Sequence, residues 1–159
     1  MSGALSALLA WLETTAAAQW VSGSLPVTAT LSSVHALAFT LVMGGAVVFD
    51  LRLLGAVLPQ RPVVDLAAPS ARIVAVGLIV SIATGVLLFS GKASAVAENG
   101  FFQTKMLLLV AAASFHFLAC RSVLREGVAT TGLQRLSGAC GLTLWIGLAV
   151  AACAFILFE

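Results

Sequence analysis

The chain has 159 residues, of which 61% are hydrophobic and 9% charged, and its mean hydropathy is +1.13. Soluble domains carry about a quarter charged residues, so six acidic and eight basic side chains are too few to solvate such a surface. The scattered net charge of +2 excludes a basic face that follows nucleic-acid phosphates, and three cysteines do not make a disulfide framework. The composition predicts one domain whose solvent is lipid.

Residues 1–25 predict an amphipathic helix that lies at the membrane interface. Its apolar stretch is interrupted by Glu13 and Gln19, and Trp11 and Trp20 stand near its two ends. Tryptophan side chains are enriched at the depth of the lipid headgroups. No Lys or Arg precedes the stretch, which argues against a secretory signal.

Four apolar stretches follow, each long enough to cross a hydrocarbon core of about 30 Å as a helix. Lipid satisfies no backbone hydrogen bonds and the stretches show no alternation, so helices are favoured over a β-barrel. We expect Pro59, Pro62 and Pro69 to lie in the first connector. Short connectors make neighbouring helices antiparallel, which predicts an all-α integral membrane bundle over residues 26–159 with up-and-down topology. The predicted spans are residues 30–58, 73–90, 101–124 and 136–158.

Basic residues are unevenly distributed between the two sides of this bundle. The connectors after the first and third spans, with their flanks, hold six arginines, whereas the opposite side holds two lysines. Cytoplasmic loops are enriched in Lys and Arg, so both termini are predicted on the outer side. The arginines are Arg52, Arg61, Arg72, Arg121, Arg125 and Arg135.

His35, near the outer end of the first span, is the first candidate for chemistry, because ionisable side chains within spans are costly and often functional. Gly77, Ser81 and Gly85 form a small-residue stripe on which a helix or a flat cofactor can lie; helix packing is the simpler interpretation. His35 and Met106 would make an axial pair for haem b, and two copies of His35 are a second route. The alternative is a neutral histidine bonded to a hydroxyl or carbonyl group.

His116 lies past the middle of the third span, at a different predicted depth from His35. About 12 residues, or roughly 18 Å along the helix axes, separate the two imidazoles, so one haem iron is not expected to bind both. Cys120 follows His116 by one turn on the same face, and Cys140 on the fourth span has a similar depth. These three side chains would suit Cu(I) or zinc, although buried cysteines are common as small apolar residues.

Asp50 and Arg52 are two positions apart and do not face each other on a helix. Asp50 is expected instead to form an ion pair with Arg121 or Arg72 that fixes the helix register. The sequence contains no catalytic triad, metalloprotease motif, phosphate loop or dinucleotide fingerprint, so nothing in it indicates an enzyme.

The sequence contains the blocks Trp11-Leu12-Glu13, His35-Ala36-Leu37, Asp50-Leu51-Arg52-Leu53-Leu54-Gly55, Thr84-Gly85-Val86-Leu87-Leu88-Phe89, Phe102-Gln103-Thr104-Lys105-Met106 and Trp145. Together they resemble an uncharacterised family of small bacterial inner-membrane proteins, a domain of unknown function. The match covers about Trp11 to Ala152, and it implies a four-span architecture in a bacterial inner membrane, without an activity. That family looks distantly like copper-resistance membrane domains and small b-type cytochromes, which draws attention to His35. His116 and the cysteines lie outside its motif.

The leading hypothesis is a haem-b-binding or redox-associated membrane subunit with His35 as a ligand. A non-catalytic structural or assembly subunit of a larger membrane complex, or of a homo-oligomer, is the main alternative. A copper-handling membrane protein is the third. All three contact the lipid bilayer, and none binds nucleic acid.

Overall fold

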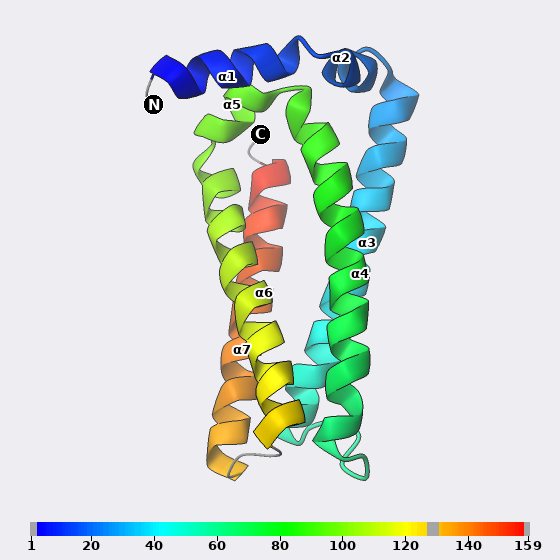
Figure 1. Cartoon of the computed structure of the whole chain (residues 1–159), viewed down its shortest axis with the longest axis vertical. Coiled ribbons are helices and arrows are strands. Elements are labelled where there is room, and N and C mark those ends of the chain that lie inside the picture. Colours follow the sequence, from blue (N-terminus) through cyan, green and yellow to red (C-terminus); the bar gives the residue numbers. More distant parts are fainter. Residues whose placement is uncertain (1–2, 127–130, 158–159) are drawn as a thin grey trace.

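The computed structural model describes residues 3–126 and 131–157, and this part of the chain contains helices and no strand. Four long helices run alternately in opposite directions and pack side by side (Figure 1). Each is long and apolar enough to cross a membrane. The predicted all-α, four-helix up-and-down membrane bundle is therefore confirmed. The helices are α1 (Gly3–Glu13), α2 (Ala16–Ser22), α3 (Leu25–Leu54), α4 (Val63–Ser90), α5 (Ala93–Glu98), α6 (Gly100–Glu126) and α7 (Thr131–Leu157).

Two short helices, α1 and α2, stand where a single interfacial helix was predicted, and they lie across one end of the bundle together with α5 (Figure 1). We call this end the capped end. The break between the helices falls at Thr15, whose hydroxyl caps α2 by accepting a hydrogen bond from Ala18 N. Trp11 and Trp20 are 63% and 60% exposed, so both indoles are free to lie among headgroups.

The cap is tied to the connector between α4 and α6 by one side chain. Glu13, at the end of α1, accepts a hydrogen bond from Ser94 N in the first turn of α5 at 2.7 Å. The first-turn N–H groups of a helix have no partner within the helix, so this carboxylate satisfies one of them. This hydrogen bond thus fastens α1 to the bundle.

The helix α3 begins at Leu25 and ends at Leu54, so it is displaced towards the N-terminus relative to the predicted span 30–58. Gly55 ends it in the left-handed conformation, with φ of 80°, and its N–H bonds back to Arg52 O. Only glycine adopts this conformation without steric cost, which accounts for the early end.

The helix α4 begins at Val63, ten positions before the predicted start of the second span. The prediction that Pro69 lies in the connector is therefore wrong, because Pro69 is inside α4. Its ring removes one backbone hydrogen bond, to the carbonyl of Asp65, and points outwards to an exposed position. The predicted end of the fourth span, Phe158, lies outside the described residues.

The small-residue stripe on α4 brings that helix very close to α3. A Cβ atom on Gly77 would lie 2.6 Å from Val42 Cγ2 and 3.0 Å from Ala38 O. Helix packing, the simpler of the two interpretations, is thus what Gly77 serves. All four long helices then share one apolar core, formed by Val42, Ala46, Val74, Leu78, Ala112, Trp145 and Leu148.

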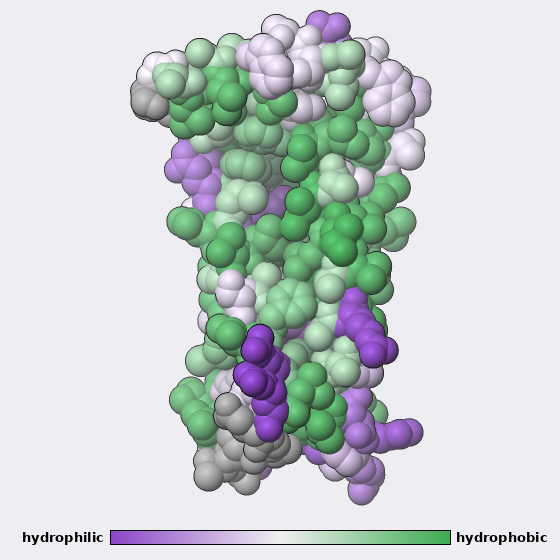
Figure 2. Space-filling view, viewed as in Figure 1, coloured by the Kyte–Doolittle hydropathy of each residue, from purple (hydrophilic) through white to green (hydrophobic). Residues whose placement is uncertain are grey.

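The outer surface of the bundle is apolar along most of its length, as the green belt in Figure 2 shows. Large apolar side chains are exposed on every long helix, among them Leu37, Ile79, Leu107 and Val150. Hydrophilic side chains are frequent near the end opposite the cap, where α3 and α6 end and α4 and α7 begin (Figure 2). We call it the arginine end, because the six arginines lie towards it.

The contact at Gly77 gives a test of the packing. Gly77→Ala should lower stability by about 1–3 kcal/mol, because the new methyl group meets the backbone of α3. Gly44→Ala is the matched control, since no atom lies within 4 Å of a Cβ placed there. Thermal unfolding in detergent should separate the two variants, and equal midpoints would contradict the observed α3–α4 approach.

Candidate functional site

His35 packs against the small-residue stripe on α4, as the haem-binding hypothesis requires. Its Nδ1 atom lies 2.9 Å from Ser81 O and 3.1 Å from Thr84 Oγ1. A carbonyl oxygen only accepts, so Nδ1 carries the proton and donates it. A Cβ on Gly85 would lie 3.1 Å from His35 Cε1, which leaves the ring seated directly on the helix. Among the described residues, Nε2 has no hydrogen-bond partner.

Lys105 on α6 lies within electrostatic range of the half-buried His35. Its ammonium group stands 5.8 Å from the centre of the Phe155 ring on α7. Met106 is the next residue on α6, rotated by about 100° around the axis, and it is 41% exposed. The predicted pair of His35 and Met106 is therefore not assembled in this arrangement, because the inward position belongs to Lys105.

Asp50 points into the bundle and is 1% exposed. A Cβ on Gly141 of α7 would lie 2.5 Å from both carboxyl oxygens, and Oδ2 has no hydrogen-bond partner. Arg52 bonds instead to Arg61 O at 2.7 Å, and Arg121 is exposed. The predicted ion pair of Asp50 with Arg121 or Arg72 is thus not formed among the described residues, since both arginines are exposed whereas Asp50 is buried.

His116 is 1% exposed and surrounded by aromatic edges. The rings of Phe49, Phe117 and Trp145 meet it in T-shaped contacts, with centroids 5.5, 5.7 and 6.0 Å away. Its Nδ1 atom and Trp145 Nε1 are buried without a hydrogen-bond partner. A polar ring is therefore enclosed by a mainly aromatic wall.

The other nitrogen of His116 has a defined role. Nε2 lies 3.3 Å from Ser70 Oγ, and Ser70 Oγ donates its proton to Gly45 O at 2.7 Å. The serine has only that one proton, so it accepts from His116, and Nε2 carries the ring proton of the neutral form. Nδ1 is consequently left as an acceptor.

The cysteines are divided between the interior and the surface. Cys120 Sγ lies 3.6 Å from His116 Nε2, which confirms that the two side chains share one face of α6. Cys140, however, is exposed, and no group of three potential metal ligands occurs among the described residues. The predicted set of His116, Cys120 and Cys140 is thus not brought together, because α7 turns Cys140 away from the bundle.

The two histidines lie at different depths, as predicted. His35 contacts Ser81 and His116 contacts Ser70, both on α4. These serines are 11 positions apart, or about 16 Å along the helix. Two separate sites therefore exist, one around His35 and one that we call the inner polar cluster. The inner polar cluster consists of Asp50, Ser70, His116, Cys120 and Trp145.

Sequence reasoning missed Trp145 as a member of this cluster. Trp145 is one turn beyond Gly141 on α7, so the residue that receives Asp50 and the residue that meets His116 lie on one helix face. The four-residue spacing of Gly141 and Trp145 can be read from the sequence, but it does not show which face of α7 turns inwards.

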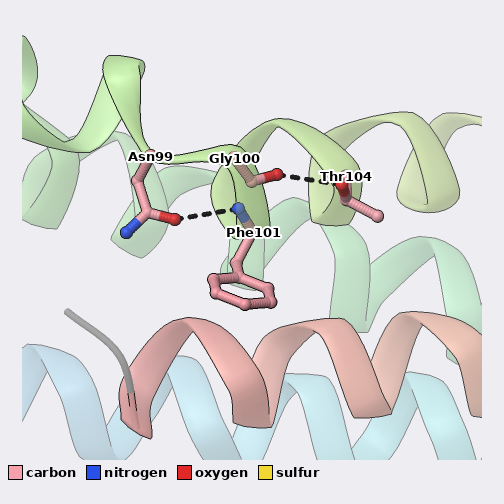
Figure 3. A pocket seen from close by; sticks show the side chains of 4 residues that line it. All are labelled: Asn99, Gly100, Phe101 and Thr104. Atoms are coloured by element: carbon pink, nitrogen blue, oxygen red, sulfur yellow. Dashed lines mark hydrogen bonds between the residues drawn. The ribbon is translucent and has the colours of Figure 1, made fainter.

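A surface depression of about 450 Å³ lies at the start of α6 (Figure 3). Asn99 Oδ1 accepts hydrogen bonds from Phe101 N and Phe102 N, and Thr104 Oγ1 donates to Gly100 O. The two bonds to Asn99 cap the start of α6, and the bond from Thr104 returns to a carbonyl one turn earlier on the same helix. The polar atoms named here thus serve the first turns of α6.

Four helices long and apolar enough to cross a membrane define this chain as a multi-pass helical membrane protein. It belongs to a family of unknown function, DUF6644, whose model matches residues 8–158. The resemblance seen in the sequence is thereby confirmed. Neither a curated protein nor a solved structure matches the chain.

The contact between Gly141 and Asp50 can be measured by a double-mutant cycle. Gly141→Ala should cost about 1–3 kcal/mol of stability, because its methyl group displaces a buried carboxyl group. In an Asp50→Ala background the cost should fall by more than about 0.5 kcal/mol. Gly147→Ala is the control, since its nearest neighbour would be Leu108 at 3.8 Å. Additive effects in thermal unfolding would disprove the contact.

Proposed function

We propose that the protein is a haem-b-binding, redox-associated membrane subunit in which His35 is the protein ligand. The observation that carries this proposal is the hydrogen bond from His35 Nδ1–H to Ser81 O at 2.9 Å. A metal-bound histidine almost always donates its other ring N–H to such an acceptor, which fixes the tautomer. The Nε2 lone pair of His35 is then available to an iron atom.

The surroundings of His35 fit one axial ligand and one anionic edge of a porphyrin. The imidazole of His35 itself occupies the space over Gly85, and α3 covers Gly77, so neither glycine offers a flat wall to a porphyrin. Lys105 offers an ammonium group suited to a propionate. A second protein ligand would come from another copy of the chain. Bound haem b would supply one-electron transfer, while the chain holds and orients it.

We further propose a bacterial inner membrane as the location, with both termini outside. The arginine end would then face the cytoplasm, in agreement with the enrichment of Lys and Arg in cytoplasmic loops. His35 would lie in the outer half of the membrane, near the capped end.

A non-catalytic structural or assembly subunit, in a larger complex or a homo-oligomer, is the second candidate. The bonds from His35 to Ser81 and Thr84 also suit a histidine that only holds α3 against α4. Both candidates share the fold and differ in whether His35 Nε2 ligates a metal. Optical spectroscopy therefore distinguishes them directly.

Protein purified after expression with ample haem should show a Soret band that shifts on reduction with dithionite. His35→Ala should abolish or shift this band, because it removes the axial ligand. His116→Gln is the matched control. Ser70, which contacts His116, lies about 16 Å along α4 from Ser81, which contacts His35, so loss of the His116 ring should largely spare the band.

The absence of a Soret band would refute haem binding and favour the structural subunit. A band lost equally in both variants, with both proteins folded by circular dichroism, would contradict the assignment of His35 as the ligand. Substitution of Gly85 by Leu gives a further check, because its side chain would occupy the space beside His35 Cε1 and should perturb the band.

The orientation is testable by cysteine labelling in intact cells. Arg61→Cys, in a background without the three native cysteines, should resist a membrane-impermeant maleimide, because Arg61 lies at the proposed cytoplasmic end. Glu98→Cys is the control at the capped end, where the exposed position should react. The reverse pattern would invert the topology.

A further inference from the structure

Three buried side-chain atoms lack a hydrogen-bond partner in the described part of the chain, and all belong to the inner polar cluster. They are Asp50 Oδ2, His116 Nδ1 and Trp145 Nε1. The three side chains are 1%, 1% and 0% exposed. Buried polar atoms without a partner are rare in folded proteins, because each loses its hydration without compensation. Their concentration in one cluster points to a ligand there.

The three side chains approach the same interior region from three helices. Asp50 on α3 rests on Gly141, one turn before Trp145 on α7. The Trp145 ring meets the His116 ring of α6 edge to face, with centroids 6.0 Å apart. Asp50 is also within electrostatic range of Cys120, whose Sγ lies 3.6 Å from His116 Nε2.

The hydrogen-bonding capacity of these atoms is complementary to one molecule of water. The indole N–H of Trp145 only donates, and Nδ1 of His116 accepts because Nε2 carries the proton that Ser70 receives. The Asp50 carboxylate accepts as well. A water molecule can donate two hydrogen bonds and accept up to two, so it can satisfy one donor and two acceptors at the same time.

We propose that the inner polar cluster binds a water molecule that links Asp50 to His116 and makes them a proton-sharing pair. When Asp50 is protonated, its proton passes to the water while the water gives one of its own to His116 Nδ1. Asp50 is left as a carboxylate and His116 as an imidazolium, and the water is regenerated. Trp145 orients the water through its oxygen and takes no part in the transfer.

The groups that face this pair are few. Cys120 faces it from α6 and the Ser70 hydroxyl from α4, while Phe49 and Phe117 supply apolar walls. The nearest arginines in the sequence, Arg52 and Arg121, are directed outwards. No cation among the described residues neutralises Asp50, so the carboxyl group either keeps its proton or shares it with His116, whose imidazolium would compensate the carboxylate. The proposal does not depend on haem binding at His35.

The first test uses nuclear magnetic resonance of protein with ¹⁵N-labelled tryptophan in detergent or nanodiscs. The indole N–H of Trp145, assigned by loss of its signal in Trp145→Phe, should show a cross-peak to water although the side chain is fully buried. Trp20→Phe is the matched control, because that indole is 60% exposed and meets solvent at the surface. Absence of a water cross-peak for Trp145 would overturn the proposal.

The second test follows the infrared band of Asp50, assigned by its loss in Asp50→Asn. Trp145→Phe and His116→Gln should each shift this band and alter its response to D₂O, whereas Trp20→Phe should leave it unchanged. Trp145→Phe keeps the aromatic wall, so it separates loss of the N–H group from loss of packing. A band that neither variant moves would exclude proton sharing, even if water contacts Trp145.

Discussion

Lipid offers no hydrogen bonds, so every polar atom inside these four helices must find a partner within the bundle. Near the cap this demand is met for the fully buried atoms but not for His35 Nε2, which has no hydrogen-bond partner among the described residues. His35 bonds to a backbone carbonyl of the neighbouring helix, and the hydroxyl of Thr84 bonds to Val80 O on its own helix. In the inner polar cluster three fully buried atoms have no hydrogen-bond partner among the described residues. Both sites therefore leave polar atoms available to a ligand, and they differ in that those of the inner polar cluster are enclosed by the bundle.

Close helix approaches decide which polar groups meet. Gly77 lets α4 touch the backbone of α3, and this places Ser81 O within reach of His35, one turn further along α4. Gly138 and Gly141 allow a similar close approach between α7 and α3, and the carboxyl group of Asp50 packs against Gly141. Without these glycines the helices would stand further apart, and both sites would lose a wall. The sites are thus consequences of backbone contact rather than of a preformed cavity.

The number, order and relative depth of the helices follow from sequence, because hydropathy and rise per residue determine them, whereas the bounds of the first two spans differ from those predicted. The four spans, the depth separation of His35 and His116, and the shared face of His116 and Cys120 were predicted on that basis. Rotation about the helix axis was not predictable, because helices that are apolar on all sides carry little amphipathic signal. Cys140 therefore turned out exposed and Asp50 turned inwards, without the expected arginine.

The two proposed sites share α3, yet they are energetically almost separate. His35 and Asp50 are 15 positions apart, about 22 Å along the helix. Two unit charges at that distance interact by about 0.8 kcal/mol at an effective dielectric constant of about 20. An energy of about 1.4 kcal/mol corresponds to a tenfold change in an equilibrium constant. A change of charge at His35 would therefore alter the protonation equilibrium of Asp50 by less than a factor of about ten.

The electrostatic interaction alone is thus too weak to couple electron transfer at His35 strongly to proton movement at Asp50, and strong coupling would require a displacement of α3. Since Gly77 and Gly141 hold α3 against helices on two sides, such a displacement must break close contacts at both. The optical signal of His35 and the vibrational signal of Asp50 are for this reason independent measurements, and the failure of one proposal leaves the other standing.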